Sequence, residues 1–174
     1  QLSIPEENNT VFTYTGSAQT YTLLENDNYT ISGNSQTNAG THEVIVALKN
    51  KSNYQWSDGT TDNLTYSFEI KKAIVDKPVA DDTVFTYTGQ EQTYNLVANS
   101  LYTISNATQT NADTYEVIVE LINKDNVEWS DGTTDDLTYS FVINKAIVDK
   151  PVADDTVFTY TGQEQTYNLV ANSL

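Results

Sequence analysis

The sequence predicts an all-β protein built from tandem, small antiparallel β-sandwich modules. The segment VFTYTG-x-x-QTY-x-L occurs three times, beginning at Val11, Val84 and Val157, and each beginning lies 73 residues after the last. Between turn-like residues, apolar side chains alternate with polar ones, and no segment shows the helical period of about 3.6 residues. A repeat of several short alternating strands joined by polar turns is typical of a small sandwich.

The spacing also predicts the domain organisation. We expect two whole repeats, residues 1–73 and 74–146, followed by residues 147–174 as the beginning of a third, incomplete repeat. Aligned without a gap, the whole repeats are identical at 45 of 73 positions, and residues 74–101 match residues 147–174 at all 28. Such uniformity indicates tandem duplication, so we expect further copies beyond this segment.

Composition narrows the possible functions. The formal net charge is −16, from 24 acidic and 8 basic residues, which argues against nucleic-acid binding because phosphates require clustered Lys and Arg. The chain has neither Cys nor Met, so disulfides and thiol chemistry are excluded. No apolar run approaches the roughly 20 residues that span a bilayer, so we expect any export signal or anchor to lie outside this segment.

The junction segments carry all the prolines of the chain, Pro5, Pro78 and Pro151. Proline cannot donate a hydrogen bond to a central strand ladder, and acidic residues surround it in the segment IVDKPVADDT. Each junction is therefore interpreted as an inter-domain linker or as an edge strand that enters the next module.

The repeated opening motif is interpreted as a strand, a tight loop and a second strand, forming a hairpin or a corner. In the second copy, the alternation places Phe85 and Tyr87 on one face of the first strand, and Tyr94 and Leu96 on one face of the second strand.

Two longer strands give the clearest inward and outward faces. In TYEVIVEL the inward residues are Val117, Val119 and Leu121, and the first copy keeps Val44, Val46 and Leu48 at these positions. The strand near the end of each repeat shows the same behaviour, with four inward residues per copy: Leu64, Tyr66, Phe68 and Ile70, then Leu137, Tyr139, Phe141 and Ile143. Between these strands, Trp56 or Trp129 precedes an Asp-Gly turn and is predicted to be a central core residue.

Three blocks in a fixed order, F-T-Y-T-G-x-x-Q, T-N-A-G-T-H-E-V and N-Y-Q-W-S-D-G-T-T-D, resemble bacterial immunoglobulin-like repeats of the MBG type. The resemblance covers nearly all of each repeat and implies an Ig-like sandwich in a surface adhesin or filament, and therefore an extracellular location on the bacterial cell surface. The second copy departs from the pattern at two positions. Asp113 replaces Gly40, which argues against a glycine-dependent turn, and Val127 replaces Tyr54, which predicts a peripheral position.

Acidic residues are the candidate metal ligands. Carboxylates from the junction and from the turn after Trp129 are predicted to hold calcium between modules if the two segments meet; the alternative is a solvated acidic surface that keeps the protein soluble. The first copy has Ser3, Asn8 and Asn9 at the junction positions, which weakens a repeated site. The candidate ligands are Asp76, Asp81 and Asp82, with Asp131, Asp135 and Asp136 from the turn. No other cofactor is expected.

Covalent and catalytic chemistry finds little support. Lys72, Asn38 and Glu43 provide the residue types of an isopeptide cross-link, but the alternation places the glutamate on an outward face, where it would not be a buried acid. His42 is the single histidine and becomes Tyr115 in the second copy, so we interpret it as a strand residue at a sheet margin. No catalytic grouping is recognisable, and no enzyme activity is expected.

Two functions remain. The first is structural, an extended stalk or shaft in which neighbouring repeats of the same protein are the partners. The alternative is a multivalent module in which each repeat binds a glycan or a protein weakly. Residues 147–174 contain only an opening segment that cannot bury its apolar face alone, so pairing with another copy through β-strand addition is a further possibility.

Overall fold

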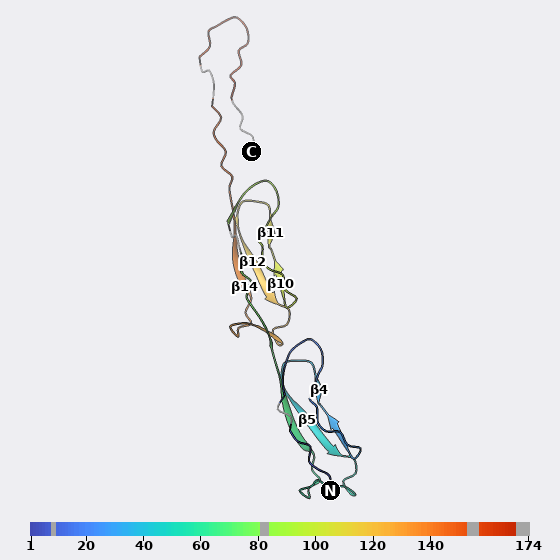
Figure 1. Cartoon of the computed structure of the whole chain (residues 1–174). Helices are drawn as coiled ribbons and strands as arrows, with labels where there is room; N and C mark the ends of the chain where they lie inside the picture. The colour runs from blue at the N-terminus through green and yellow to red at the C-terminus, as the bar shows by residue number, and fades with distance from the viewer. Residues whose placement is uncertain (8–9, 81–83, 153–156, 170–174) are drawn as a thin grey trace.

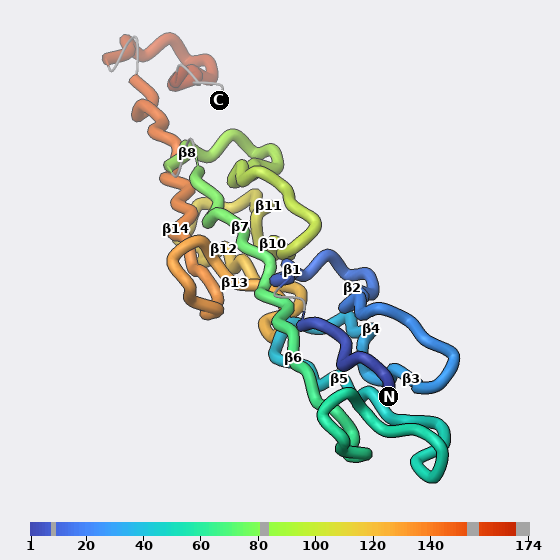
Figure 2. Tube along the Cα trace, turned by 60° about the horizontal axis from the view of Figure 1, so that its bottom comes forward, coloured from blue at the N-terminus to red at the C-terminus, as the bar shows by residue number. Residues whose placement is uncertain are grey.

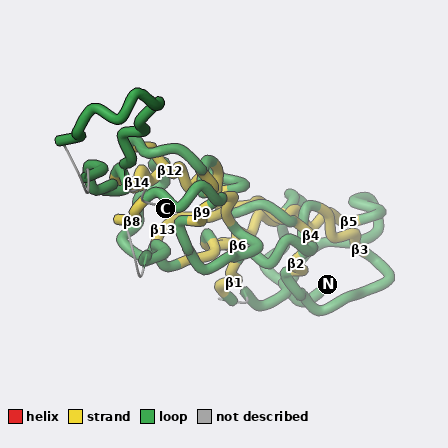
Figure 3. Tube along the Cα trace, turned by 90° about the horizontal axis from the view of Figure 1, so that it is seen from above, coloured by secondary structure: helices red, strands yellow, loops and turns green. Residues whose placement is uncertain are grey.

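The computed structural model describes residues 1–7, 10–80, 84–152 and 157–169. These residues form strands and loops (Figure 3), and within them no helix is present. The predicted all-β class is therefore confirmed. We refer to the described residues of 1–72 as the first module and to those of 73–144 as the second module.

The first module is built on a four-stranded sheet and a two-stranded sheet. The four-stranded sheet has the order β1-β6-β5-β3, and β2 pairs with β4. The strands are β1 (Val11–Thr13), β2 (Gln19–Thr20), β3 (Tyr29–Ser32), β4 (Ser35–Gln36), β5 (Gly40–Leu48) and β6 (Leu64–Lys71). A single bridge from Leu2 to Trp56 adds the beginning of the chain to this module.

The second module has the same plan with one additional strand pair. Its four-stranded sheet has the order β10-β12-β14-β8, β11 pairs with β9, and β13 pairs with β7. The strands are β7 (Ala73–Val75), β8 (Val84–Thr86), β9 (Gln92–Thr93), β10 (Tyr102–Ser105), β11 (Thr108–Gln109), β12 (Thr114–Leu121), β13 (Val127–Trp129) and β14 (Leu137–Asn144).

The core of each module lies between its four-stranded sheet and its smaller strand pairs, which gives a sandwich-like arrangement. Trp56 and Trp129 are fully buried, as predicted, and each indole Nε1 donates a hydrogen bond of 2.8 Å to a backbone carbonyl, of Asp62 or Asp135. The predicted inward residues of β5 and β12 are buried too: Val44, Val46, Leu48, Val117, Val119 and Leu121.

The sandwich is not purely antiparallel, and this part of the expectation is wrong. Strand β1 runs parallel to β6, β8 runs parallel to β14, and β7 runs parallel to β13. The chain enters each four-stranded sheet and leaves it in the same direction, so its first and last strands run side by side. Alternation of side chains is the same in parallel and antiparallel strands, which is why the sequence pattern did not distinguish the two.

The opening motif forms a corner, and the hairpin alternative is wrong. Strand β1 belongs to the four-stranded sheet, whereas β2 pairs with β4 in the other layer. Gly16, with φ of 79°, turns the chain between the two layers, and the Gln19 side-chain amide donates a 2.8 Å hydrogen bond to the Thr15 hydroxyl across the turn. Two alternating strands around a turn give the same pattern whether they pair with each other or with different partners.

The two modules follow one another along one long axis (Figure 1). Only Lys72 separates β6 from β7, and β7 pairs with β13, so the junction is an edge strand of the second module (Figure 2). Pro5 and Pro78 are buried, and their carbonyls accept hydrogen bonds from the hydroxyls of Tyr66 (2.7 Å) and Tyr139 (2.6 Å). Of the two interpretations of the junction, the edge strand is confirmed.

Beyond Asn144 the chain continues away from the second module (Figure 1). The described part of residues 145–169 adds no strand to either module. It exposes large apolar side chains, most of whose counterparts are better covered in the second module; Tyr167, for example, is 54% exposed, whereas the corresponding Tyr94 is 2% exposed. Strand addition to another copy stays a prediction.

Candidate functional site

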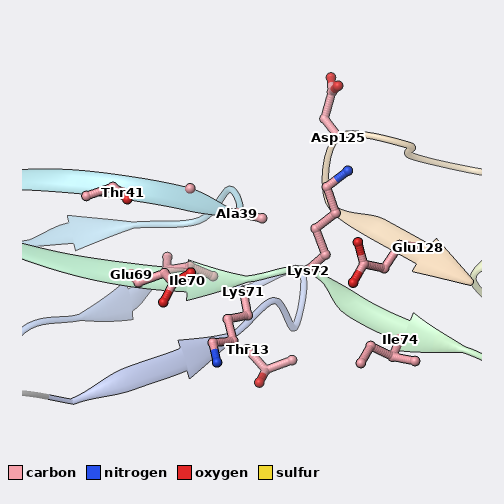
Figure 4. Close-up of a pocket in the computed structure, with 11 residues that line it drawn as sticks. Thr13, Ala39, Thr41, Glu69, Ile70, Lys71, Lys72, Ile74, Asp125 and Glu128 are labelled. Carbon is pink, nitrogen blue, oxygen red and sulfur yellow. The ribbon is translucent and has the colours of Figure 1, made fainter. Parts of the chain in front are cut away.

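The candidate functional site is the joint between the two modules. It forms where β6 passes into β7, and the ends of both modules surround a shallow cleft of about 580 Å³ (Figure 4). Side chains of both charges line the cleft: Lys71 and Lys72 are positive, and Glu69, Asp125 and Glu128 are negative. These two positive and three negative side chains leave a formal charge of only −1, which is weak attraction for a charged ligand, so the joint is better explained by contacts between the modules.

Asn126 connects the two modules through its side chain. Its carboxamide oxygen accepts a 2.6 Å hydrogen bond from the backbone N–H of Ala39, and its amide nitrogen donates a 3.1 Å hydrogen bond to the side-chain oxygen of Asn38. Asn126 is only 3% exposed. Both polar ends of this buried carboxamide are therefore satisfied by the first module, and separating the modules would return them to water or leave them unpaired.

Backbone contacts close the joint near the connecting residue. The N–H of Ala73 donates to the carbonyl of Asn126 at 2.9 Å. The Lys72 ammonium reaches across the connection toward the loop that carries Asp125 (Figure 4), where it donates to the carbonyl of Lys124 at 2.8 Å. The connection and the loop before β13 are thus joined by two hydrogen bonds, which restrict rotation about Lys72.

Apolar residues form the other side of the joint. Tyr14 of the first module packs against the core cluster of the second module, which contains the buried Val127. A groove of about 260 Å³ here is lined by Tyr14, Leu101, Ile122 and Val127, among others. The expectation that position 127 is peripheral is wrong for the second module, because Val127 is 2% exposed whereas the corresponding Tyr54 is 38% exposed.

The loop that reaches Asn126 is supported from within the first module. The His42 ring nitrogen Nε2 lies 2.8 Å from the carbonyl oxygen of Asn38, and the ring lies 5.4 Å from that of Phe68. In the second module, the Tyr115 hydroxyl donates to the carbonyl of Asn111 at 3.0 Å. His42 and Tyr115 therefore make the same contact, with the carbonyl of the residue four positions earlier, which explains why an imidazole and a phenol replace one another at this position.

The described residues include only some of the predicted calcium ligands. Asp81 and Asp82 lie outside the described residues. Asp136 forms an ion pair with Lys124 at 2.7 Å, and the carbonyl of Asp135 accepts the Trp129 hydrogen bond. Within the described residues no group of three or more His, Asp or Glu is placed to hold a metal ion, and Asp76 is exposed. Calcium at the junction stays a prediction.

Asp131, the remaining acidic candidate, has a different partner. Its carboxylate lies 2.5 Å from the Lys77 ammonium and accepts a 2.7 Å hydrogen bond from the Thr133 hydroxyl. The Lys77 ammonium, and then Thr133, hold the pKa of Asp131 well below its ordinary value. Both side chains of the ion pair are exposed, so it contributes little to stability.

The residues proposed for an isopeptide bond take part in the joint instead. Lys72 donates to the Lys124 carbonyl, and the Asn38 side chain accepts from Asn126. Glu43 is exposed, as its outward assignment predicted.

The described residues contain no helix that is long and apolar enough to cross a membrane.

Sequence reasoning did not find Asn126. The sequence nevertheless contains an indication, because the loop before each Trp keeps asparagine at the same position, Asn53 and Asn126, while four nearby residues change between the copies. The changes are Lys49 to Ile122, Ser52 to Asp125, Tyr54 to Val127 and Gln55 to Glu128. Asn53 is exposed at the opposite end of the first module, so its side chain alone does not reveal the role of its counterpart.

Comparison with models of known protein families finds no match to this chain, and no curated protein matches it either.

Proposed function

We propose that this chain is a structural repeat segment of a bacterial surface adhesin or extracellular filament, in which the modules form an extended stalk. The observation that carries the proposal is the joint, where a buried Asn126 and a one-residue connection fix the second module at the end of the first. A flexible linker would leave the modules free to rotate, whereas a bonded joint keeps a rod extended.

Three properties of the sequence support the surface location. The acidic net charge of −16 keeps a long repeated protein soluble, and the absence of Cys and Met removes the most easily oxidised side chains. The ordered blocks around Gly16, Ala39 and Trp56 resemble bacterial Ig-like repeats of the MBG type, and an Ig-like topology with a 73-residue period is part of this proposal.

The distribution of aromatic residues favours a stalk over a multivalent binding module. Binding through stacked rings requires exposed aromatic faces on a module. Most aromatic side chains of the two modules are buried or half-buried, and Tyr54 is only 38% exposed. The strongly exposed Tyr160 lies in the segment after the second module, where no strand is formed within the described residues.

Distance measurements test the fixed joint. Thr65 and Thr138 are exposed on β6 and β14 at corresponding positions, and the chain contains no cysteine, so Thr65→Cys with Thr138→Cys places one spin label on each module. Pulsed electron resonance should give one narrow distance distribution. In that background Asn126→Ala should broaden the distribution, whereas Asn53→Ala, at an exposed position, should leave it unchanged. A broad distribution in the parent chain would refute the stalk.

Localisation needs a separate experiment in the bacterium that encodes the chain. Antibodies raised against the purified chain should label intact cells or filaments attached to them. Labelling that requires permeabilised cells would refute the surface location while leaving the measured rigidity of the joint intact.

A further inference from the structure

We infer that each module is a tension-bearing unit, in which the parallel pair formed by its first and last sheet strands resists the pull. The inference rests on the proposed stalk function, because a stalk that carries a load is pulled along its axis. It specifies which hydrogen bonds carry that load and predicts that the resistance depends on the direction of the force.

The direction of the two strands determines how they are loaded. Strands β1 and β6 are adjacent and parallel, with Val11 opposite Glu69 and Thr13 opposite Lys71, and strands β8 and β14 are arranged in the same way. Force applied to the two ends of a module pulls the first strand backward and the last strand forward. The ladder hydrogen bonds lie across this direction, so they are loaded together rather than one after another.

The ladder continues past the ends of the short strands. The N–H of Tyr14 donates to the carbonyl of Lys71 at 2.8 Å, and the N–H of Tyr87 donates to the carbonyl of Asn144 at 2.8 Å. The net contributions of these hydrogen bonds are small when the bonds break singly. They become additive in the barrier when one sliding step has to break all of them.

Ring packing stabilises the same pair from the core side. Phe12 of β1 meets Phe68 of β6 edge to face, with ring centroids 5.7 Å apart, and Phe85 of β8 meets Phe141 of β14 at 5.2 Å. Sliding β8 along β14 would pull Phe85 away from its partner and expose apolar surface to water.

The joint transmits force directly from the first module to the second, because the connection is too short to extend first. Because one residue separates β6 from β7, tension leaving the first module directly loads the pair of β7 with β13 and then β8 with β14. The first module has only the Leu2 to Trp56 bridge in place of the β7 pair. The second module therefore has two parallel pairs in series along the path of the force.

Pulling one module in two directions tests the inference. Introduced cysteines set the points of attachment, and Val79, Gln90 and Lys145 are all exposed. In the full chain, Val79→Cys with Lys145→Cys pulls β8 and β14 in opposite directions, so that their bonds are loaded together. The matched variant, Gln90→Cys with Lys145→Cys, pulls the same ends of both strands apart and breaks the bonds one at a time.

Single-molecule force spectroscopy at one loading rate should give an unfolding force several-fold lower for the second pair of attachment points. The released length, about 3.6 Å for each residue between the cysteines, identifies the event as unfolding of the second module. Forced unfolding reports the unfolding barrier, so thermal melts of the two variants should coincide and exclude a stability difference. Equal unfolding forces in the two directions would overturn the inference, even if the spin-label distances confirm a rigid stalk.

Pulling the full chain by its ends supplies a second test. The pair of β7 with β13 has to break before the pair of β8 with β14 is loaded, so unfolding of the second module should be preceded by a short extension that the first module lacks. Absence of this extra event would contradict the role assigned to β7.

Discussion

The two modules have nearly the same interior but different ends. The buried core residues of β5 and β6 recur unchanged in β12 and β14, for example Val44, Val46 and Phe68 as Val117, Val119 and Phe141. At the end that faces the first module, however, the second module has Leu101, Ile122 and Val127 where the first module has Asn28, Lys49 and Tyr54.

Position in the array explains this difference. Leu101, Ile122 and Val127 line the groove beside Tyr14 of the first module. Val127 is buried and Leu101 half-buried there, whereas Ile122 stays 62% exposed at the rim. Their polar counterparts lie at an end that no described residue of another module covers. A repeat can therefore keep its fold and change its contacts with neighbouring modules through a few residues at its ends, since packing inside the module and packing between modules involve different side chains.

The largest expected effect is a loss of stability when the buried tryptophan that both modules share is removed. Trp129→Ala and Trp56→Ala each remove a fully buried indole and its hydrogen bond, and each should destabilise its own module by about 3–5 kcal/mol. Hydrogen exchange read separately for each module measures the loss. Equal loss of protection in both modules after one substitution would show that they unfold as one unit and not separately.

Exchanging the residues at position 54 and its counterpart tests the difference between the ends. Val127→Tyr places a larger, polar side chain in a site that is 2% exposed, and should destabilise the second module by about 2 kcal/mol. The reciprocal change, Tyr54→Val, acts on a partly exposed side chain and should stay within about 0.5 kcal/mol. Chemical denaturation measures both, and equal effects would remove the distinction between the two ends.

A smaller effect is expected at a turn that differs between the modules. Gly33 has φ of 78°, and a Cβ there would lie 2.4 Å from the carbonyl oxygen of Glu43, whereas its counterpart Asn106 adopts φ of 59° with a side chain. Gly33→Asn should destabilise the first module by about 1 kcal/mol. Asn106→Gly should stabilise the second by about 0.5 kcal/mol, because glycine relieves the left-handed strain. Thermal melting of both variants decides whether the signs are opposite.

The smallest expected effect is acid sensitivity of the second module. Because the folded-state pKa of Asp131 is lowered by Lys77, folding gains stability above the unfolded pKa of about 3.8 and loses it as the pH falls below that value. The first module has Ile4 in place of Lys77, so Lys77→Ile should make the acid response of the two modules more alike. Denaturation curves between pH 2 and pH 7 at low salt measure the change; an unaltered pH profile would assign the response to other carboxylates.

Much of the local structure was predictable. The alternation correctly assigned the inward faces of β5, β6, β12 and β14, and the aromatic residue before Asp-Gly was correctly placed in the core. Pairing was not predictable in the same way. The sequence was compatible with both a hairpin and a corner at Gly16, and only the corner forms; the expectation of antiparallel neighbours for β1 was wrong.

The joint was the least predictable feature. Asn126 and Asn53 are the same residue type in the same loop, yet one is buried and the other is exposed. Burial of Asn126 depends on Ala39, which lies 87 residues away in the chain. Only the apolar replacements around it, Ile122 for Lys49 and Val127 for Tyr54, carry a signal of contact, and interpreting them requires knowing that both lie at one end of the module.

The sequence by itself determined the all-β class, the strand faces and the Trp-centred cores, because alternation and turn residues act between neighbours in the chain. Only the tertiary structure decided that the first and last sheet strands of a module run parallel, and that Asn38, Ala39 and Asn126 meet at the joint. These features depend on where distant segments come to lie, and the hydrogen-bonding groups of the backbone are the same at every residue apart from proline. The sequence around a backbone N–H group therefore does not indicate which acceptor it will bond in the folded chain.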